Sequence, residues 1–124
     1  LTDSKRYTIC ENMVIYMKEN LGQPIGIPEI AEAVGISVSL ASQWFKEEMN
    51  ETIYGYFTRL RMEHARELLL HTDCKIADIA MEVGYQHENS FIRKLREYYD
   101  VAPGKYRRLY EINVNHEIDM KGGS

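Results

Sequence analysis

The stretch "IADIAMEVGY", residues 76–85, decides the fold of this chain. Its apolar residues recur at i, i+3, i+4 and i+7, the spacing that lines one face of an α-helix: they are Ile76, Ile79, Ala80 and Val83. Gly84 follows, where a helix can end in a left-handed residue. The small Ala80 side chain lets another helix backbone approach closely. The stretch therefore predicts a helix that ends at Gly84 and turns tightly into a second helix.

The same pattern occurs a second time, in "IPEIAEAVGI", residues 27–36. Ile27, Ile30, Ala31, Val34 and Gly35 correspond, 49 positions earlier, to Ile76, Ile79, Ala80, Val83 and Gly84. Beyond the glycines the offset is 50, so that Phe45, Asn50 and Tyr56 correspond to Leu95, Asp100 and Tyr106. One residue has therefore been added to the second turn. Two copies are too few for a solenoid, so the sequence predicts a duplicated supersecondary unit.

Capping residues and periodicity predict helices over the rest of the chain. Pro28 fits the first turn of the helix that ends at Gly35, Ser37 and Thr52 are good N-caps, and Pro103 can start a short helix. The expected helices, besides the two that end at the glycines, cover about 7–20, 38–49, 52–70, 88–99 and 103–109. No strand is needed before residue 110.

These elements predict an all-α fold of about seven helices, in which two helix-turn-helix subdomains are joined by a long linker helix. The subdomains are expected at about 27–49 and 76–99, with the linker helix at about 52–70. We expect the following residues to be buried: Ile9, Met13, Tyr16 and Met17 in the first helix, and Phe57, Leu60, Ala65, Leu68 and Leu69 in the linker helix.

A chain of 124 residues fits one compact domain, which we place at 5–110, followed by a flexible tail at 111–124. Cys10 and Cys74 are expected to be free thiols, because two cysteines 64 positions apart lack the density of a secreted disulfide scaffold. No stretch has the length and apolar character of a membrane span, and no signal peptide opens the sequence. We expect a cytoplasmic protein.

The charge is acidic as a whole but basic in one segment. The chain has 15 basic and 19 acidic residues. Residues 93–108 reverse this balance, with Arg93, Lys94, Arg96, Lys105, Arg107 and Arg108 against Glu97 and Asp100. A charge run is more often a solvated surface than a site, so this basic stripe alone does not decide for nucleic acid.

The helices that follow the two glycines each have one polar face that the predicted packing leaves free. In the first, Ala41, Trp44, Phe45 and Glu48 are expected inward, which leaves the first polar face: Ser39, Ser42, Gln43 and Lys46. In the second, Phe91, Leu95 and Tyr98 are expected inward, which leaves the second polar face: Glu88, Asn89, Ile92, Arg93 and Arg96. Such side chains can contact base edges and phosphates in the major groove, with Arg93 suited to guanine and Asn89 to adenine. Two such helices, each after the same turn, favour double-stranded DNA as the partner.

The chain resembles the DNA-binding domain of the AraC/XylS family of bacterial transcription regulators. The resemblance spans about residues 7–108 and is carried by "IPEIAEAVGISVSLASQWFKEEM", "YFTRLRMEHARELL" and "KIADIAMEVGYQHENSFIRKLREYYDVAPGKYRR". It implies two recognition helices in successive major grooves on one side of the DNA. By position, it implies that Ser39, Ser42, Gln43, Glu88, Asn89, Ile92 and Arg93 read bases. Lys46 and Arg96 complete the DNA-binding residues that we predict.

Two positions depart from the family's pattern. Ala41 stands where the family usually has a larger aliphatic residue and Trp44 where it has a medium one, so a volume exchange keeps that core filled. The first polar face has no arginine, which shifts phosphate binding toward the second subdomain.

Catalytic and metal-binding motifs find little support. His71 and Cys74 lie three positions apart, but no second Cys or His pair completes a zinc site. No glycine-rich phosphate loop or nucleophile elbow occurs. We expect neither an enzyme nor a cofactor. The alternative is a helical protein-interaction module that docks a polymerase subunit or a sensor domain. As protein partners we expect RNA polymerase and a sensor or dimerisation domain outside this chain, and we expect no membrane partner.

Overall fold

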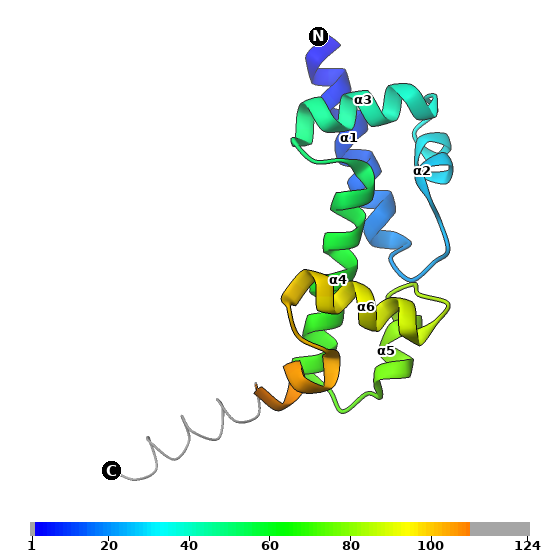
Figure 1. The fold of residues 1–124 in the computed structure, drawn as a ribbon. Coiled ribbons are helices and arrows are strands. Elements are labelled where there is room, and N and C mark those ends of the chain that lie inside the picture. Colours follow the sequence, from blue (N-terminus) through cyan, green and yellow to red (C-terminus); the bar gives the residue numbers. More distant parts are fainter. Residues whose placement is uncertain (1, 110–124) are drawn as a thin grey trace. The chain divides into compact units, whose positions relative to one another are not determined.

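The computed structural model describes residues 2–109, and every regular element in that range is a helix (Figure 1). The helices are α1 (Thr2–Glu19), α2 (Ile27–Ala33), α3 (Val38–Met49), α4 (Ile53–His71), α5 (Ile76–Glu82) and α6 (Glu88–Tyr99). A further helical segment covers residues 103–109. The all-α prediction with about seven helices is confirmed. The tail predicted at 111–124 lies outside the described residues.

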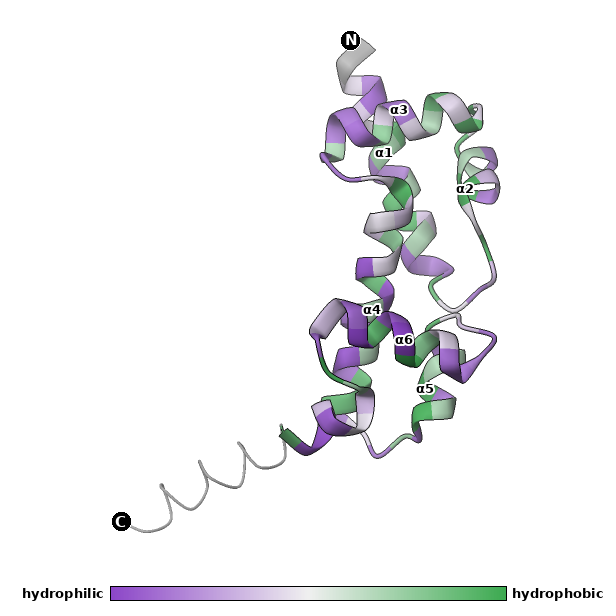
Figure 2. Ribbon diagram, in the orientation of Figure 1, coloured by the Kyte–Doolittle hydropathy of each residue, from purple (hydrophilic) through white to green (hydrophobic). Residues whose placement is uncertain are grey.

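The chain divides into two compact units between Arg61 and Met62, within α4. Unit 1 holds α1, α2, α3 and the first part of α4, and unit 2 holds the rest of α4, α5, α6 and residues 103–109. Hydrophilic and hydrophobic residues alternate along α3 and α6, as expected of helices with one packed face (Figure 2).

Unit 1 packs α2 and α3 against α1, with the start of α4 completing the core. The fully or nearly fully buried apolar residues are Cys10, Met13, Val14, Met17, Ile30, Ala31, Ala41, Phe45, Ile53 and Phe57. Phe45 also meets Tyr56 edge-on, with ring centroids 5.4 Å apart. Trp44 is partly buried against the same cluster, so Ala41 and Trp44 share the core as the sequence predicts.

Unit 2 builds an equivalent core from the second part of α4, α5 and α6. Its buried apolar residues are Met62, Ala65, Leu69, Ile79, Ala80, Val83, Phe91 and Leu95. Met62, Ala65 and Leu69 follow Cys10, Met13 and Met17 at a constant offset of 52. The second part of α4 therefore does in unit 2 what α1 does in unit 1.

The predicted inward residues are incomplete in α1 and α4 and wrong at one position in α6. α1 starts at Thr2, and it buries Cys10 and Val14 while Ile9 and Tyr16 stay only partly buried. The set at 10, 13, 14 and 17 has the i, i+3, i+4, i+7 spacing of one helix face, so the face is rotated from the predicted one. In α4, Met62 is fully buried, although the sequence analysis did not select it.

The wrong prediction concerns the end of α6. Tyr98 was expected inward but is 41 % exposed, and Tyr99 instead packs against the core of unit 2. The centroids of the Tyr99 and Tyr106 rings lie 5.3 Å apart. The segment 103–109 provides this partner, which periodicity within α6 could not reveal.

Candidate nucleic-acid interface

Each polar face is positioned by a tight turn that ends the preceding helix. Gly35 and Gly84 have φ angles of 74° and 96°, the left-handed conformation predicted for both. The Ile36 N–H donates to Ala31 O (3.2 Å) and the Tyr85 N–H donates to Ala80 O (2.9 Å), which closes the same six-residue ring in both turns. This is the Schellman motif, and it satisfies carbonyls that the helix end leaves unpaired.

The aromatic residue after Gly84 has a structural role in that motif. Helices that end in this way commonly place an apolar residue just beyond the glycine against the core. Tyr85 lies against Phe91, with ring centroids 5.7 Å apart, and packs on the core of unit 2. Ile36 packs on the core of unit 1 at the corresponding place. The apolar residue fixes the direction in which the chain enters α3 or α6.

α3 begins and packs as predicted. Ser37 Oγ accepts a hydrogen bond from the Leu40 N–H (3.1 Å), so Ser37 is the N-cap. Ala41 and Phe45 are buried on one side. The first polar face is exposed on the other side, at Ser39, Ser42, Gln43 and Lys46. The predicted division of this helix is confirmed.

α6 follows the prediction with one difference. Phe91 and Leu95 are buried, while Glu88, Asn89, Arg93 and Arg96 are exposed. Ile92 is only partly exposed because it packs against the core of unit 2. Ile92 therefore contributes less exposed surface to the second polar face than the sequence predicted.

The basic stripe does not form a single surface. Arg107 donates from Nε to Leu69 O (3.0 Å) and from Nη2 to Thr72 O (3.1 Å), so its guanidinium satisfies carbonyls at the end of α4. Lys94 pairs with Glu97 at 3.2 Å. By contrast, Arg93 and Arg96 make no side-chain hydrogen bond or ion pair with residues 4–109. The cations available to a ligand on α6 are therefore those of the second polar face.

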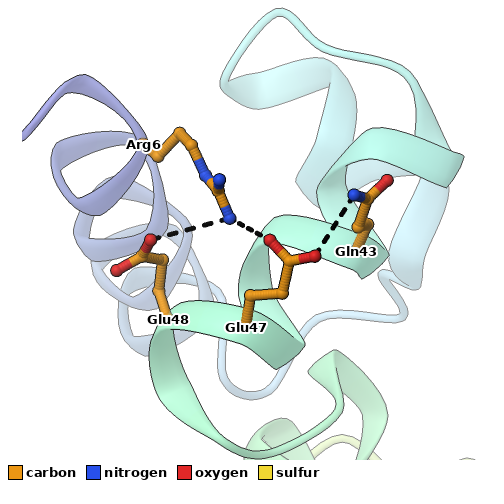
Figure 3. Close-up of polar contacts among 4 residues, drawn as sticks. All are labelled: Arg6, Gln43, Glu47 and Glu48. Atoms are coloured by element: carbon orange, nitrogen blue, oxygen red, sulfur yellow. Dashed lines mark hydrogen bonds and ion pairs between the residues drawn. The ribbon is translucent and has the colours of Figure 1, made fainter. Parts of the chain in front are cut away.

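A polar cluster that the sequence analysis missed includes Gln43 of the first polar face (Figure 3). Gln43 Nε2 donates to Glu47 Oε1 (3.2 Å), and Arg6 of α1 pairs with Glu47 and, at 3.7 Å, with Glu48. The Arg6 guanidinium also lies over the Trp44 ring, 5.5 Å from its centroid. The i, i+4 spacing of Gln43 and Glu47 could have indicated their contact. Arg6 lies 41 positions before Glu47, and no sequence pattern joins them.

Two carboxylates support the starts of helices in unit 1. Glu29 accepts the Gly26 N–H (2.8 Å), and this hydrogen bond lowers the pKa of the Glu29 carboxyl. Arg59 donates to both oxygens of Glu51 (3.2 and 2.8 Å), which lowers the pKa of Glu51. In unit 2, burial raises the pKa of Tyr99 to about 12. The Glu29 and Glu51 contacts lie at the starts of α2 and α4.

Within residues 2–109, no three His, Cys, Asp or Glu side chains gather in a group that could hold a metal ion, and no helix is long and apolar enough to cross a membrane. Cys10 and Cys74 are free, as predicted, and burial raises the pKa of the Cys10 thiol.

Both turns and both polar faces lie within a match to a known protein family. A family described as "Helix-turn-helix domain" matches residues 30–109, which include both turns and both polar faces. The chain belongs to the AraC/XylS family. This family consists of DNA-binding transcription regulators, which points away from catalysis.

Curated relatives in the AraC/XylS family regulate operons. The chain is 29 % identical over 103 residues to the lactose operon transcription activator of Staphylococcus xylosus, covering 83 % of this chain and 37 % of that protein. It is 33 % identical over 97 residues to the melibiose operon regulatory protein of Escherichia coli K12, covering 78 % of this chain and 32 % of that one. The chain thus spans about a third of the length of these relatives.

Solved AraC-type domains share the fold. The C-terminal domain of AraT, a response regulator from Geobacillus stearothermophilus, is 30 % identical with a TM-score of 0.80, over 82 % of this chain and 84 % of that one. The C-terminal domain of the response regulator yesN from Fusobacterium nucleatum is 31 % identical with a TM-score of 0.76, over 78 % and 95 %. The DNA-binding domain of AdpA, solved in complex with a target DNA, is 17 % identical with a TM-score of 0.80 over 84 % and 94 %, a likeness of fold alone.

Proposed function

We propose that this AraC-type domain binds double-stranded DNA sequence-specifically, with α3 in one major groove and α6 in the next. The observation that carries the proposal is the repetition of one arrangement in a chain of this family. Each unit has a Schellman turn at a glycine and then a helix that buries two residues and exposes a polar face. An exposed helix with such a face fits the major groove.

The two polar faces carry different chemistry for the DNA. On α6, Arg93 is suited to a bidentate contact with guanine O6 and N7, and Asn89 to adenine N6 and N7. Glu88 repels phosphate but accepts a hydrogen bond from cytosine N4, so its part is discrimination. Ile92 keeps an accessible portion that can contact a thymine methyl group. Arg96 supplies charge to the phosphates.

On α3 the contacts are mostly neutral. Ser39, Ser42 and Gln43 offer hydroxyls and an amide to base edges, and Lys46 offers charge to phosphate. The first polar face is therefore proposed to contribute more to specificity than to affinity. Phosphate contacts position a protein on DNA, while base contacts specify the sequence.

Selection of duplexes from a random pool tests the proposal. Bound sequences should contain two short blocks whose centres are about 34 Å, or roughly 10 base pairs, apart. Affinity for the selected duplex should fall steeply as salt rises, because phosphate contacts release counterions. Recovery of no preferred sequence, together with salt-independent binding to a protein partner, would favour a protein-interaction module instead.

An insertion separates the two-groove arrangement from simpler DNA binding. Adding about five base pairs between the blocks turns one groove to the far side of the duplex. Binding should then fall toward the non-specific level, whereas an insertion of the same length outside the blocks should have no effect. Equal affinity for both duplexes would contradict reading by two helices at once.

The partners beyond DNA belong to a longer regulator. Relatives more than twice as long as this chain are named as operon activators and regulators. We therefore extend the proposal to contact with RNA polymerase, to a sensor or dimerisation domain outside this chain, and to a place in the bacterial cytoplasm.

A further inference from the structure

We propose that Arg6 is a positioning residue for base recognition: through Glu47 it holds the Gln43 amide in one orientation and offsets the acidic charge beside it. This inference rests on the proposed function and deepens it. It concerns α1 and α3, which belong to the same unit.

Arg6 is held on several sides. One terminal nitrogen, Nη2, meets both the Glu47 and the Glu48 carboxylates. The guanidinium also lies over Trp44, and its Nε is buried with no hydrogen-bond partner among the described residues. The Arg6 side chain is 21 % exposed, against 46 % for Glu47. Arg6 therefore reaches the edge of the first polar face from α1, while Glu47 stays partly in solvent (Figure 3).

The contact continues from Glu47 to Gln43. An ionised carboxylate only accepts hydrogen bonds, so the amide nitrogen of Gln43 must face Glu47 and the amide oxygen must turn away. Nε2 carries two hydrogens, one of which goes to Glu47 Oε1 (3.2 Å). One N–H donor and the Oε1 acceptor are left for a ligand.

This pair of groups distinguishes bases. Adenine presents one donor, N6–H, and one acceptor, N7, in the major groove, whereas guanine presents two acceptors, O6 and N7. The held amide matches adenine with both of its remaining groups. It cannot use both N–H donors on guanine while one of them stays bonded to Glu47. The cluster therefore favours adenine over guanine at the base pair that Gln43 meets.

Charge gives Arg6 its second effect. Glu47 and Glu48 are adjacent on the helix proposed to enter the groove, where negative charge repels phosphate. Arg6 offsets that charge from α1. Unit 2 has a corresponding arrangement, because Glu97 occupies the position equivalent to Glu47 and pairs with Lys94 at 3.2 Å. In both units, the carboxylate four residues after the proposed base-reading residue is bound by a cation.

Binding to duplexes tests the proposal, with a duplex selected from a random pool by the unaltered chain and its full set of single-base variants. Gln43→Ala first locates the base pair that Gln43 reads. Arg6→Gln should weaken binding about two- to fivefold. It should also reduce discrimination between adenine and guanine at that base pair and leave the other positions unchanged. Arg6→Lys should retain most of both effects, because a single nitrogen makes the two ion pairs.

Two further variants separate charge from orientation. Arg6→Gln combined with Glu47→Ala should recover affinity, because the unpaired charge is gone, but not discrimination, because the acceptor for Gln43 is gone. Lys5→Gln removes the same charge one residue earlier on α1 and should leave both properties unchanged. If Arg6→Gln prevents folding, Glu47→Ala alone removes the same contact from α3.

A measurement without DNA separates this inference from the proposed function. The side-chain amide resonances of Gln43 in the free protein should shift in Arg6→Gln and stay near their original positions in Lys5→Gln. Unchanged resonances in Arg6→Gln would overturn the inference even if the chain selects no DNA sequence. Unchanged discrimination in a folded Arg6→Gln that still binds its duplex would overturn it with the proposed function intact.

Discussion

Unit 1 and unit 2 share a turn and a core pattern but differ in how the helix after the turn is held. In unit 1, α3 has a serine N-cap and is tied to α1 by Arg6. In unit 2, the N-cap of α6 is His87, which makes no side-chain capping bond, and Arg93 and Arg96 make no side-chain hydrogen bond or ion pair with the described residues. The duplication has thus kept the backbone geometry and changed the polar chemistry.

That difference indicates a division of labour between the units. The backbone of the turn must place a helix correctly in either unit, so its glycine and its small alanine recur. The polar face meets a different stretch of DNA in each unit, so its residues are free to differ. Substitutions in the shared turn should therefore affect the two units alike, and substitutions on the polar faces should not.

The largest effect is expected from Gly84→Val. A β-branched residue at φ 96° is strained, and the cost of about 2–3 kcal/mol falls on the turn that positions α6. Thermal unfolding followed by circular dichroism should show a lower melting temperature, and Gly35→Val should act similarly in unit 1. Gly104→Ala is the control, because an added Cβ would lie 3.7 Å from the nearest side-chain atom, Arg108 Nη1, which is an ordinary van der Waals distance. A melting temperature unchanged by Gly84→Val would contradict the role of the turn.

Arg93→Ala should have the next largest effect and should separate the units by function. Loss of a bidentate contact with guanine costs about 1–3 kcal/mol of specific binding and relaxes preference at one base pair. Gln43→Ala should cost less and change a different base pair, because its amide is neutral. Anisotropy titrations on selected duplexes measure both, with Lys18→Ala as an exposed control on α1. A change at the same base pair in both variants would rule out reading in two grooves.

The N-caps offer a smaller test. Ser37→Ala should destabilise the protein by about 1 kcal/mol, because the Leu40 N–H loses its acceptor. His87→Ala at the corresponding place should change little, and His87→Ser should stabilise α6, since His87 already has the extended backbone of an N-cap. Urea unfolding curves of the three variants give the comparison. Equal losses from Ser37→Ala and His87→Ala would show that the two helix starts do not differ as described.

The smallest effect is expected in the dependence of stability on pH. Arg59 lowers the pKa of Glu51, so this pair contributes stability above the ordinary pKa of a glutamate, and the contribution is lost as pH falls through the lowered value. The pair is partly exposed, so the contribution is about 0.5 kcal/mol or less. Unit 2 has Val101 at the corresponding position and lacks this dependence. The free energy of unfolding should therefore fall slightly less steeply from neutral to acidic pH in Glu51→Gln than in the unaltered chain. Identical pH dependence in the two proteins would show that the pair makes no such contribution.

The sequence was most informative where the structure depends on local geometry. Spacing predicted the turns at Gly35 and Gly84 and the cap at Ser37 because these residues act within a few positions of their own. The same holds for Thr52, whose Oγ1 accepts a hydrogen bond from the Gly55 N–H (2.9 Å). α3 and α6 begin and end at the predicted residues for the same reason.

Errors came from contacts between distant residues. Tyr98 and Tyr99 both fit the end of an amphipathic helix, and only Tyr106, from another segment, decides which of them packs. Arg107 looked like part of a DNA-binding stripe but caps the end of α4. Arg6 was missed because Glu47 and Glu48, with which it pairs, lie more than 40 positions away. Which side chains meet DNA stays a prediction for both polar faces.

The continuity of α4 has a consequence for folding. A helix is costly to start and cheap to extend, with a nucleation constant of about 10⁻³. Ile53 and Phe57 at one end of α4 belong to the core of unit 1, and Met62, Ala65 and Leu69 belong to the core of unit 2. Whichever core forms first has already started α4, and the other core inherits a helix that needs only to be extended. Assembly of one half of the protein thereby lowers the entropic barrier for the other.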